Sequence, residues 1–542
     1  MGGPEVATTA PDRTSTAGET GEGDADDRQL LERLKVGWFG AGPVSSYWLT
    51  RFFILRGLGL IYFVAFFSII RQAPGLIGSH GILPARWFLN EVHADYGSLS
   101  FWKIPTLFWF GVSDRALLGF GWLGVALSVA LLAGVANAPL CAALWFLYLS
   151  FVHVGQVFWG YGWELLLLEL GFLAIFLSPA LSPRPLPRSP PPVVVIWLMR
   201  WLAFRLMFGA GLIKLRGDPC WTDLTCMYFH YETQPNPNPL SFWFHHFPPF
   251  VHRAAVLFNH FVELIAPWGV FGPRRVRHVA GGFLVVFQVI LILSGNLSFL
   301  NWLTIVVCLS CFDDSLFERL FPRRLRARIR ERLHRAGEAA EETQARLWVV
   351  RALAVIVALL SLNPLVNMLS PRQAMNASFD PFSLVNTYGA FGSVSRERYE
   401  VVLEGTSDDP QDPNARWLEY EFFCKPGDPR RRPCWISPYH YRLDWQMWFA
   451  GLGTYRQQPW ILRLIYKLLE GDDAVEALLA KDPFPARPPR AIRAGYYRYR
   501  FSDDLSRGYW QRERVDEYLP ALSLDDPRLL DTLDRLGWLK PE

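Results

Sequence analysis

The chain has 542 residues, of which 51% are apolar, 15% aromatic and only 19% charged, a composition that excludes an ordinary soluble enzyme. The 54 Lys and Arg nearly balance the 50 Asp and Glu, so the net charge of +4 gives no reason to expect a nucleic-acid partner. Seven Cys are too few for a disulfide scaffold.

The chain begins with a polar leader, residues 1–45, whose first half is rich in Thr, Gly, Asp and Glu. Because the leader has little apolar surface to offset the entropy lost on ordering, we expect it to be disordered and cytoplasmic. The first apolar run comes only after this leader, so that run is not a cleavable signal peptide.

Long apolar runs with few charges follow, and about nine of them are long enough to cross the ~30 Å core of a bilayer as helices. The runs are Phe52 to Ile70, Ala116 to Val135, Pro139 to Phe158, Trp163 to Ser178, Val193 to Leu215, Ala254 to Phe271, Val279 to Ser294, Leu297 to Phe312 and Leu347 to Val366. The sequence therefore predicts a polytopic α-helical membrane bundle at 46–312, with an outside loop at 216–252 and a last transmembrane helix at 347–367.

The basic residues predict the orientation, because Lys and Arg accumulate on the cytoplasmic side of membrane proteins. With the amino end inside, the basic connections near Arg184, at Pro273 to Arg277 and at Asp313 to Arg346 all fall inside. We expect residues 313–346, with nine Arg, to be a basic cytoplasmic helical segment. An odd number of crossings then places the last third of the chain in a lumen or periplasm.

Residues 380–542 are expected to form a small extracytoplasmic α+β domain rich in strands. Alternating apolar and polar residues predict strands at Arg398 to Glu404, Trp417 to Cys424 and Tyr496 to Phe501, and apolar spacing predicts a helix at Pro459 to Glu470. A second helix near DWQMWFAGL, Asp444 to Leu452, presents an aromatic patch. This patch either packs against the domain core or the membrane surface, or contacts an unfolded client.

The cysteines fit the predicted topology. Cys220 and Cys226 lie together in the outside loop, and Cys424 and Cys434 lie together in the outside tail, where an oxidising compartment permits disulfides. We expect a disulfide within each pair, with unpaired thiols as the alternative.

Charged side chains within the apolar runs are costly in hydrocarbon unless they are paired or hydrated. Glu169, Arg205, His260 and Glu263 form this intramembrane polar cluster. Their similar depths along the helices suggest that Arg205 pairs with Glu263 and that Glu169 pairs with His260. The pairs could hold the bundle together or line a cavity for a lipid, a quinone or a proton relay. A metal site at His260 and Glu263 has no third ligand at a matching spacing.

The outside loop contains His230, Glu232 and Gln234 just before QPNPNPLS, a stretch that the Pro residues push into extended or turn conformations. His230 and Glu232 either stabilise turns of this loop or perform acid–base chemistry. Ser437, His440 and Asp444 contain the residue types of a hydrolase triad, but they lie too close together in the sequence for one. The chain has neither a G-x-S-x-G nor a nucleotide-binding loop, so we expect no cofactor and no ATP-driven step.

Several motifs resemble those of the lipase maturation factor family. They are GAGLIKLRGDPCW, the aromatic and Pro-rich loop after it, NHFVELIAPW, SGNLSFLNWLT, CFDD and the tail segment Glu419 to Leu452, and the resemblance spans roughly Ser46 to Leu524. It implies a membrane protein that assists folding and assembly of secreted lipases, with the outside tail binding the client. Tyr439, His440, Tyr441, Asp444, Trp445 and Trp448 are the client-binding candidates.

The family resemblance implies the endoplasmic reticulum membrane for a eukaryotic source, and the inner membrane would be its counterpart in a bacterium. The helical part is also distantly similar to the membrane domain of vitamin K-dependent carboxylases. A membrane enzyme that acts on a lipid-soluble substrate within the bundle is therefore the alternative function.

Overall fold

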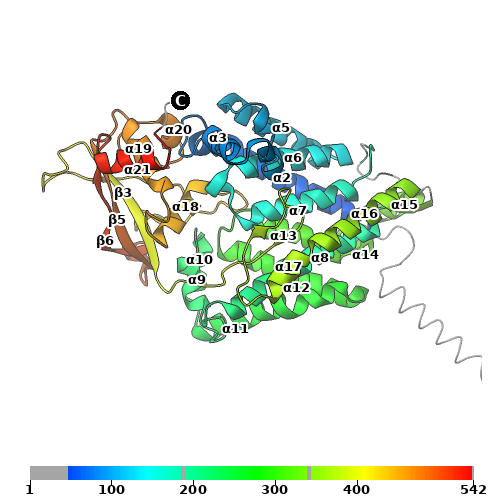
Figure 1. Ribbon diagram of the computed structural model, residues 1–542. Helices are drawn as coiled ribbons and strands as arrows, with labels where there is room; N and C mark the ends of the chain where they lie inside the picture. Colours follow the sequence, from blue (N-terminus) through cyan, green and yellow to red (C-terminus); the bar gives the residue numbers. More distant parts are fainter. Residues whose placement is uncertain (1–46, 183, 185–186, 188, 339–342, 540–542) are drawn as a thin grey trace, which may run out of the picture.

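A computed structural model describes residues 47–182, 184, 187, 189–338 and 343–539. The predicted leader, residues 1–45, lies outside these residues. The remaining chain forms a helical bundle followed by a domain built on a small sheet, which lies at one end of the bundle (Figure 1).

The bundle is formed by apolar helices joined by short turns, as the apolar runs predict. Its helices are α2 (Trp48–Ile77), α3 (Ala85–Tyr96), α4 (Ser100–Lys103), α5 (Asp114–Ala133), α6 (Ala138–Val154), α7 (Gly162–Leu177), α8 (Val193–Arg216), α11 (Pro249–His260), α12 (Arg274–Ser294), α13 (Leu300–Cys308), α16 (Gln344–Leu360) and α17 (Leu362–Leu369). Side-chain caps define two of the starts, because Ser113 accepts from the Ala116 amide and Asn137 from the Leu140 amide.

Six helical segments are long and apolar enough to cross a membrane, within the part of the chain that the structure describes. They are Trp48–Ile77, Asp114–Ala133, Val193–Arg216, Pro249–Phe271, Arg274–Ser294 and Gln344–Leu369. A seventh span would need Leu300–Cys311 and Asp314–Leu320 together, which meet at a bend of 110°.

The predicted count of about nine spans is not confirmed. All nine apolar runs are helical, but α6 has 17 residues and α7 has 16, so each rises only about 25 Å. Apolar content alone does not separate a spanning helix from a shorter helix that is buried among its neighbours, and α7 is mostly buried.

The predicted outside loop at 216–252 folds into two short helices, α9 (Met227–Thr233) and α10 (Pro239–His245). Asn238 and Ser241 cap the start of α10 reciprocally. At the opposite end of the bundle, the basic stretch is helical as predicted and forms α14 (Asp314–Phe317) and α15 (Arg323–Glu338) (Figure 1).

The C-terminal domain contains a four-stranded antiparallel sheet in the order β4-β3-β5-β6. Its strands are β3 (Arg398–Thr406), β4 (Leu418–Glu419), β5 (Ala491–Phe501) and β6 (Trp510–Leu522), and a separate pair is formed by β1 (Ala377–Ser378) and β2 (Asn386–Thr387). Its helices are α18 (Arg442–Gly451), α19 (Trp460–Glu470), α20 (Asp473–Glu476) and α21 (Pro527–Arg535).

The strands predicted at Arg398 to Glu404 and Tyr496 to Phe501 and the helix predicted at Pro459 to Glu470 are present. The strand predicted at Trp417 to Cys424 is not, since only Leu418 and Glu419 form β4. The chain leaves the sheet after Tyr420, and Glu421 pairs instead with Lys481.

The two parts of the molecule share a hydrophobic core. One continuous cluster of buried side chains runs from α2, α6 and α7 into α18, α19 and the sheet. A glycine permits one close approach between the two parts, because a Cβ on Gly75 of α2 would meet the backbone of Ala474 in α20. The domain is therefore packed directly on the bundle end.

Candidate functional site

The candidate site is the joint between the bundle and the C-terminal domain. We define the joint as the loop segment 227–238, the tail segment 424–448 and the side chains of α2, α7 and β3 that contact them. These segments are far apart in the sequence, and they contain every loop and tail residue that the sequence singled out except Cys220 and Cys226.

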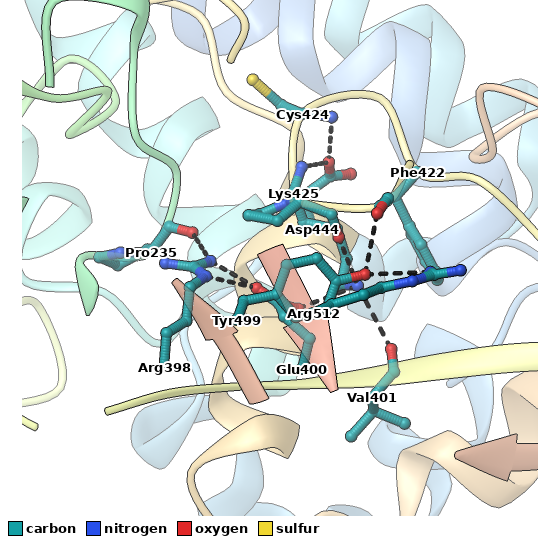
Figure 2. Close-up of polar contacts among 12 residues, drawn as sticks. Pro235, Arg398, Glu400, Val401, Phe422, Cys424, Lys425, Asp444, Tyr499 and Arg512 are labelled. Atoms are coloured by element: carbon teal, nitrogen blue, oxygen red, sulfur yellow. Dashed lines mark hydrogen bonds and ion pairs between the residues drawn. The ribbon is translucent and has the colours of Figure 1, made fainter. Parts of the chain in front are cut away.

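The tail segment begins with a disulfide between Cys424 and Cys434, which confirms the predicted pairing, as does the disulfide between Cys220 and Cys226. The Asp444 carboxylate, fully buried in α18, accepts hydrogen bonds from the amides of Cys424 at 2.5 Å and Lys425 at 2.8 Å (Figure 2). Burial raises the pKa of Asp444 to about 6, although these two amides oppose the shift. Asp444 therefore fixes the disulfide loop against α18.

An ion pair connects α18 to the bundle. Arg442 Nη1 donates to Glu164 Oε1 at 2.7 Å and to the Phe158 carbonyl at 2.8 Å, and neither charged side chain is exposed. The guanidinium carbon also lies 4.0 Å from the ring centre of Trp159. Glu164 begins α7, so this contact joins the domain to the end of a bundle helix.

Gln72, near the end of α2, connects the same tail segment to a second bundle helix. Its amide nitrogen donates to the Tyr439 hydroxyl and the His440 carbonyl, both at 2.9 Å, and its oxygen accepts from the Arg442 amide at 2.8 Å. His440 Nδ1 lies 2.9 Å from the Ser298 hydroxyl, and burial holds the pKa of His440 well below its ordinary value. His440 is thus a neutral residue within the joint.

Arg398 of β3 connects the sheet to the loop. Its guanidinium donates to the Pro235 carbonyl at 2.8 Å (Figure 2). It also donates to the carbonyls of Glu232 at 2.9 Å and of Gln234. Glu400 balances its charge and also pairs with Lys425 Nζ at 2.9 Å. A buried chain of charges therefore runs from the loop through β3 to the disulfide segment.

The three predicted loop residues have structural contacts in the joint. His230 is buried edge-on against Phe391, and burial, followed by the charge of Lys214, lowers its pKa to about 4. Glu232 accepts from the Phe501 amide at 3.0 Å, and the Gln234 side chain donates to the Ser294 carbonyl at 2.8 Å. These contacts fit the turn-stabilising interpretation of the loop.

The predicted pairing within the intramembrane polar cluster is wrong. Arg205 pairs with Glu169, and Glu263 pairs with Lys214 of α8 at 2.6 Å. His260 instead lies 3.0 Å from the Trp221 carbonyl. Equal depth places residues on one level of the membrane but does not say which helices are neighbours. Lys214 gives no signal as a partner in the sequence, because it lies at the end of its apolar run.

The Arg205–Glu169 pair also holds the start of the C-terminal domain. Arg205 donates to the Asn386 carbonyl at 2.6 Å, and Glu169 accepts from the Asn386 amide at 2.9 Å and the Tyr388 hydroxyl at 2.8 Å. Asn386 lies in β2, so this intramembrane pair belongs to the attachment of the domain.

The six client-binding candidates do not form an exposed patch in this structure. His440, Asp444 and Trp445 are buried, and the Trp448 indole donates to the Thr233 carbonyl at 2.9 Å. Tyr439 and Tyr441 are partly exposed. The aromatic face predicted for α18 instead packs on the bundle, where Trp445 lies 4.8 Å from Trp163 between ring centres.

The joint does not have the geometry of a hydrolase. Ser437 Oγ donates to the Ser298 carbonyl, while His440 contacts the Ser298 hydroxyl and Asp444 binds backbone amides, so the three side chains do not form a relay. Among the residues that the structure describes, no group of three or more His, Cys, Asp or Glu is placed to hold a metal ion.

Comparison with known proteins gives two family matches. The lipase maturation factor transmembrane domain matches residues 49–319, and the lipase maturation factor C-terminal domain matches residues 384–520. Lipase maturation factor 1 of Bos taurus is 48% identical over 526 residues, covering 92% of this chain and 93% of that protein.

More distant relatives include lipase maturation factor 2 of Homo sapiens, which is 31% identical over 607 residues that cover 90% of this chain and 85% of that protein. No solved structure matches the chain. The resemblance seen in the sequence is confirmed over both parts of the molecule, and the chain belongs to the lipase maturation factor family.

Proposed function

We propose that this protein assists the folding and assembly of secreted lipases as a membrane-attached, ATP-independent factor. The observation that carries the proposal is the joint, in which buried ion pairs and hydrogen bonds hold the C-terminal domain against the bundle end. A domain fixed in this way offers a constant surface next to the membrane. Binding energy at that surface would keep a partly folded client from aggregating until its subunits pair.

The six client-binding candidates divide into two groups in this proposal. His440, Asp444, Trp445 and Trp448 position the domain, because their side chains contact the protein itself. Tyr439 and Tyr441 are partly exposed and can contact a client directly. A tyrosine ring suits this role, since it supplies a large contact area at a small entropy cost.

We place the C-terminal domain on the lumenal side of the endoplasmic reticulum membrane, where secreted proteins fold. Two disulfides, one in the loop and one in the tail, support an oxidising compartment for this end of the molecule. The arginines of α15 at the other end support a cytoplasmic location there.

The test is secretion of a homodimeric lipase from cells that lack their own maturation factors. Expression of this chain should restore secreted lipase activity, and Arg442→Met should remove most of that gain. Arg430→Met is the matched control, since Arg430 is exposed in the same tail segment. Equal secretion of active lipase with and without this chain, at equal cellular abundance of the lipase, would contradict the proposal.

The intramembrane pairs are assigned a structural role in this proposal. Glu263 accepts from Lys214 and, at 3.0 Å, from the Asn259 amide group. Glu263→Gln should therefore lower the abundance of the protein, and lipase secretion should fall in proportion. A membrane enzyme would behave differently, because its activity would vanish while its abundance stayed normal.

A further inference from the structure

A groove lies where the end of α2 meets the C-terminal domain. Its volume is about 480 Å³, within the range of ligand-binding pockets. Phe63, Phe67 and Arg71 of α2 form one side, and Tyr439, Tyr441 and Leu478 of the C-terminal domain form the other.

The α2 side of the groove extends along the membrane. Phe63, Phe67 and Arg71 are spaced four residues apart, so they share one face of the helix. Arg71 directly follows the apolar run that ends at Ile70, and Phe63 lies about 12 Å further into that run. The groove therefore connects the hydrocarbon level of α2 to the level of the membrane surface.

The lining includes five aromatic side chains and one cation. The Phe67 and Tyr439 rings lie 6.2 Å apart edge to face, and Phe423 stacks on Tyr441 with ring centres 4.4 Å apart. Arg71 is exposed and is the only charged residue among the described residues that line the groove. An anion with an apolar chain matches this arrangement, because the guanidinium would bind the anion at the surface and the aromatic wall would cover the chain.

We propose that the groove binds a glycerophospholipid of the adjacent leaflet, with its phosphate at Arg71 and an acyl chain along Phe67 and Phe63. The groove matches two chemical groups, a phosphate and a hydrocarbon chain joined to it. Both groups occur together in the phospholipids that would surround α2 in a membrane. This inference is independent of the proposed function, because the binding needs no lipase.

The test uses the full chain in vesicles of phosphatidylcholine and phosphatidylserine that contain a phospholipid with a photoactivatable acyl chain. Labelled peptides are identified after digestion. Peptides with residues 63–72 and 436–443 should be labelled about tenfold more than the peptide with Val286, an exposed residue of α12.

Two variants and their controls test the two halves of the groove. Ala477→Trp fills the groove and should lower its labelling about tenfold, whereas Ala480→Trp, at an exposed alanine outside the lining, should not. Arg71→Gln should lower the labelling several-fold, and Arg372→Gln, at an exposed arginine just after α17, should leave it unchanged.

Labelling of the groove equal to that at Val286, or unaffected by both Ala477→Trp and Arg71→Gln, would overturn the proposal. If Ala477→Trp fails to fold, the comparison of Arg71→Gln with Arg372→Gln still shows whether the groove binds phospholipid. In the same vesicles, which contain no lipase, a photoreactive residue at position 439 that captures a protein in place of phospholipid would also overturn it.

Discussion

Breaking the ion pair between Arg442 and Glu164 should loosen the C-terminal domain from the bundle. Both side chains are fully buried, and the pair is joined at 2.7 Å with the Phe158 carbonyl as a second acceptor. Removing one partner of such a pair leaves an uncompensated buried charge, which costs about 3–5 kcal/mol. Arg442→Met and Glu164→Gln should each lower the free energy of unfolding by about 4 kcal/mol.

The assay is a double-mutant cycle on the full chain in detergent, read as melting temperature and as rate of limited proteolysis. The double variant contains neither charge, so its loss should be smaller than the sum of the two single losses by about 2 kcal/mol or more. Arg430→Met controls for the loss of an exposed arginine in the same segment. Strictly additive losses, or single variants as mild as Arg430→Met, would refute the reasoning.

Two further predictions concern the same end of the molecule, and a third concerns the orientation of the chain in the membrane. The pKa of Asp444 is raised to about 6 from an ordinary value near 3.8, so its stabilising contribution is complete below about pH 4 and is lost as the pH rises through 6. The difference in free energy of unfolding between the native chain and Asp444→Asn should therefore change by about 2 kcal/mol between pH 4 and pH 7, and a constant difference in melting curves would contradict this. Replacing Cys424 and Cys434 by Ser should lower the free energy of unfolding by about 3 kcal/mol, measured by thermal unfolding, with the reduced native chain as the control. The prediction fails if the variant and the native chain are equally stable under oxidising conditions. In sealed microsomes, added protease should cut the arginine-rich α15 and spare the sheet, and the reverse pattern would show that the orientation is inverted.

The helices of the bundle could be predicted from the sequence because long apolar runs leave few other structures to the backbone. The number of helices that span the membrane could not be predicted in the same way. The run Trp163 to Ser178 is as apolar as its neighbours, but the helix that it forms ends after 16 residues and is covered on most sides. The 110° bend follows Cys311, where the predicted run ends at Phe312, and the short helical segment beyond it, Asp314–Leu320, belongs to the predicted basic segment.

The parts of the joint were visible in the sequence, but their contacts were not. Trp445 and Trp448 stood out because aromatic residues are rare at such density, and the sequence allowed both packing against the rest of the protein and contact with a client. Burial against α7 and the loop depends on how the domain docks, which a sequence pattern does not encode. Arg442 and Arg398 gave no signal of their own, since their partners, Glu164 and the carbonyls of Glu232 and Pro235, lie far away in the sequence.

The buried charges of the joint indicate a requirement for a defined domain orientation. Apolar residues of similar volume would pack the same interface at least as stably, because a buried ion pair recovers little more than its desolvation cost. An apolar interface tolerates sliding, however, whereas Arg442 and Arg398 each lose their partners if the domain shifts by a few ångströms. We infer that the charges at this place fix the orientation of the domain more than they stabilise it. The proposed function needs such an orientation, because a client would have to be held at a constant position next to the membrane.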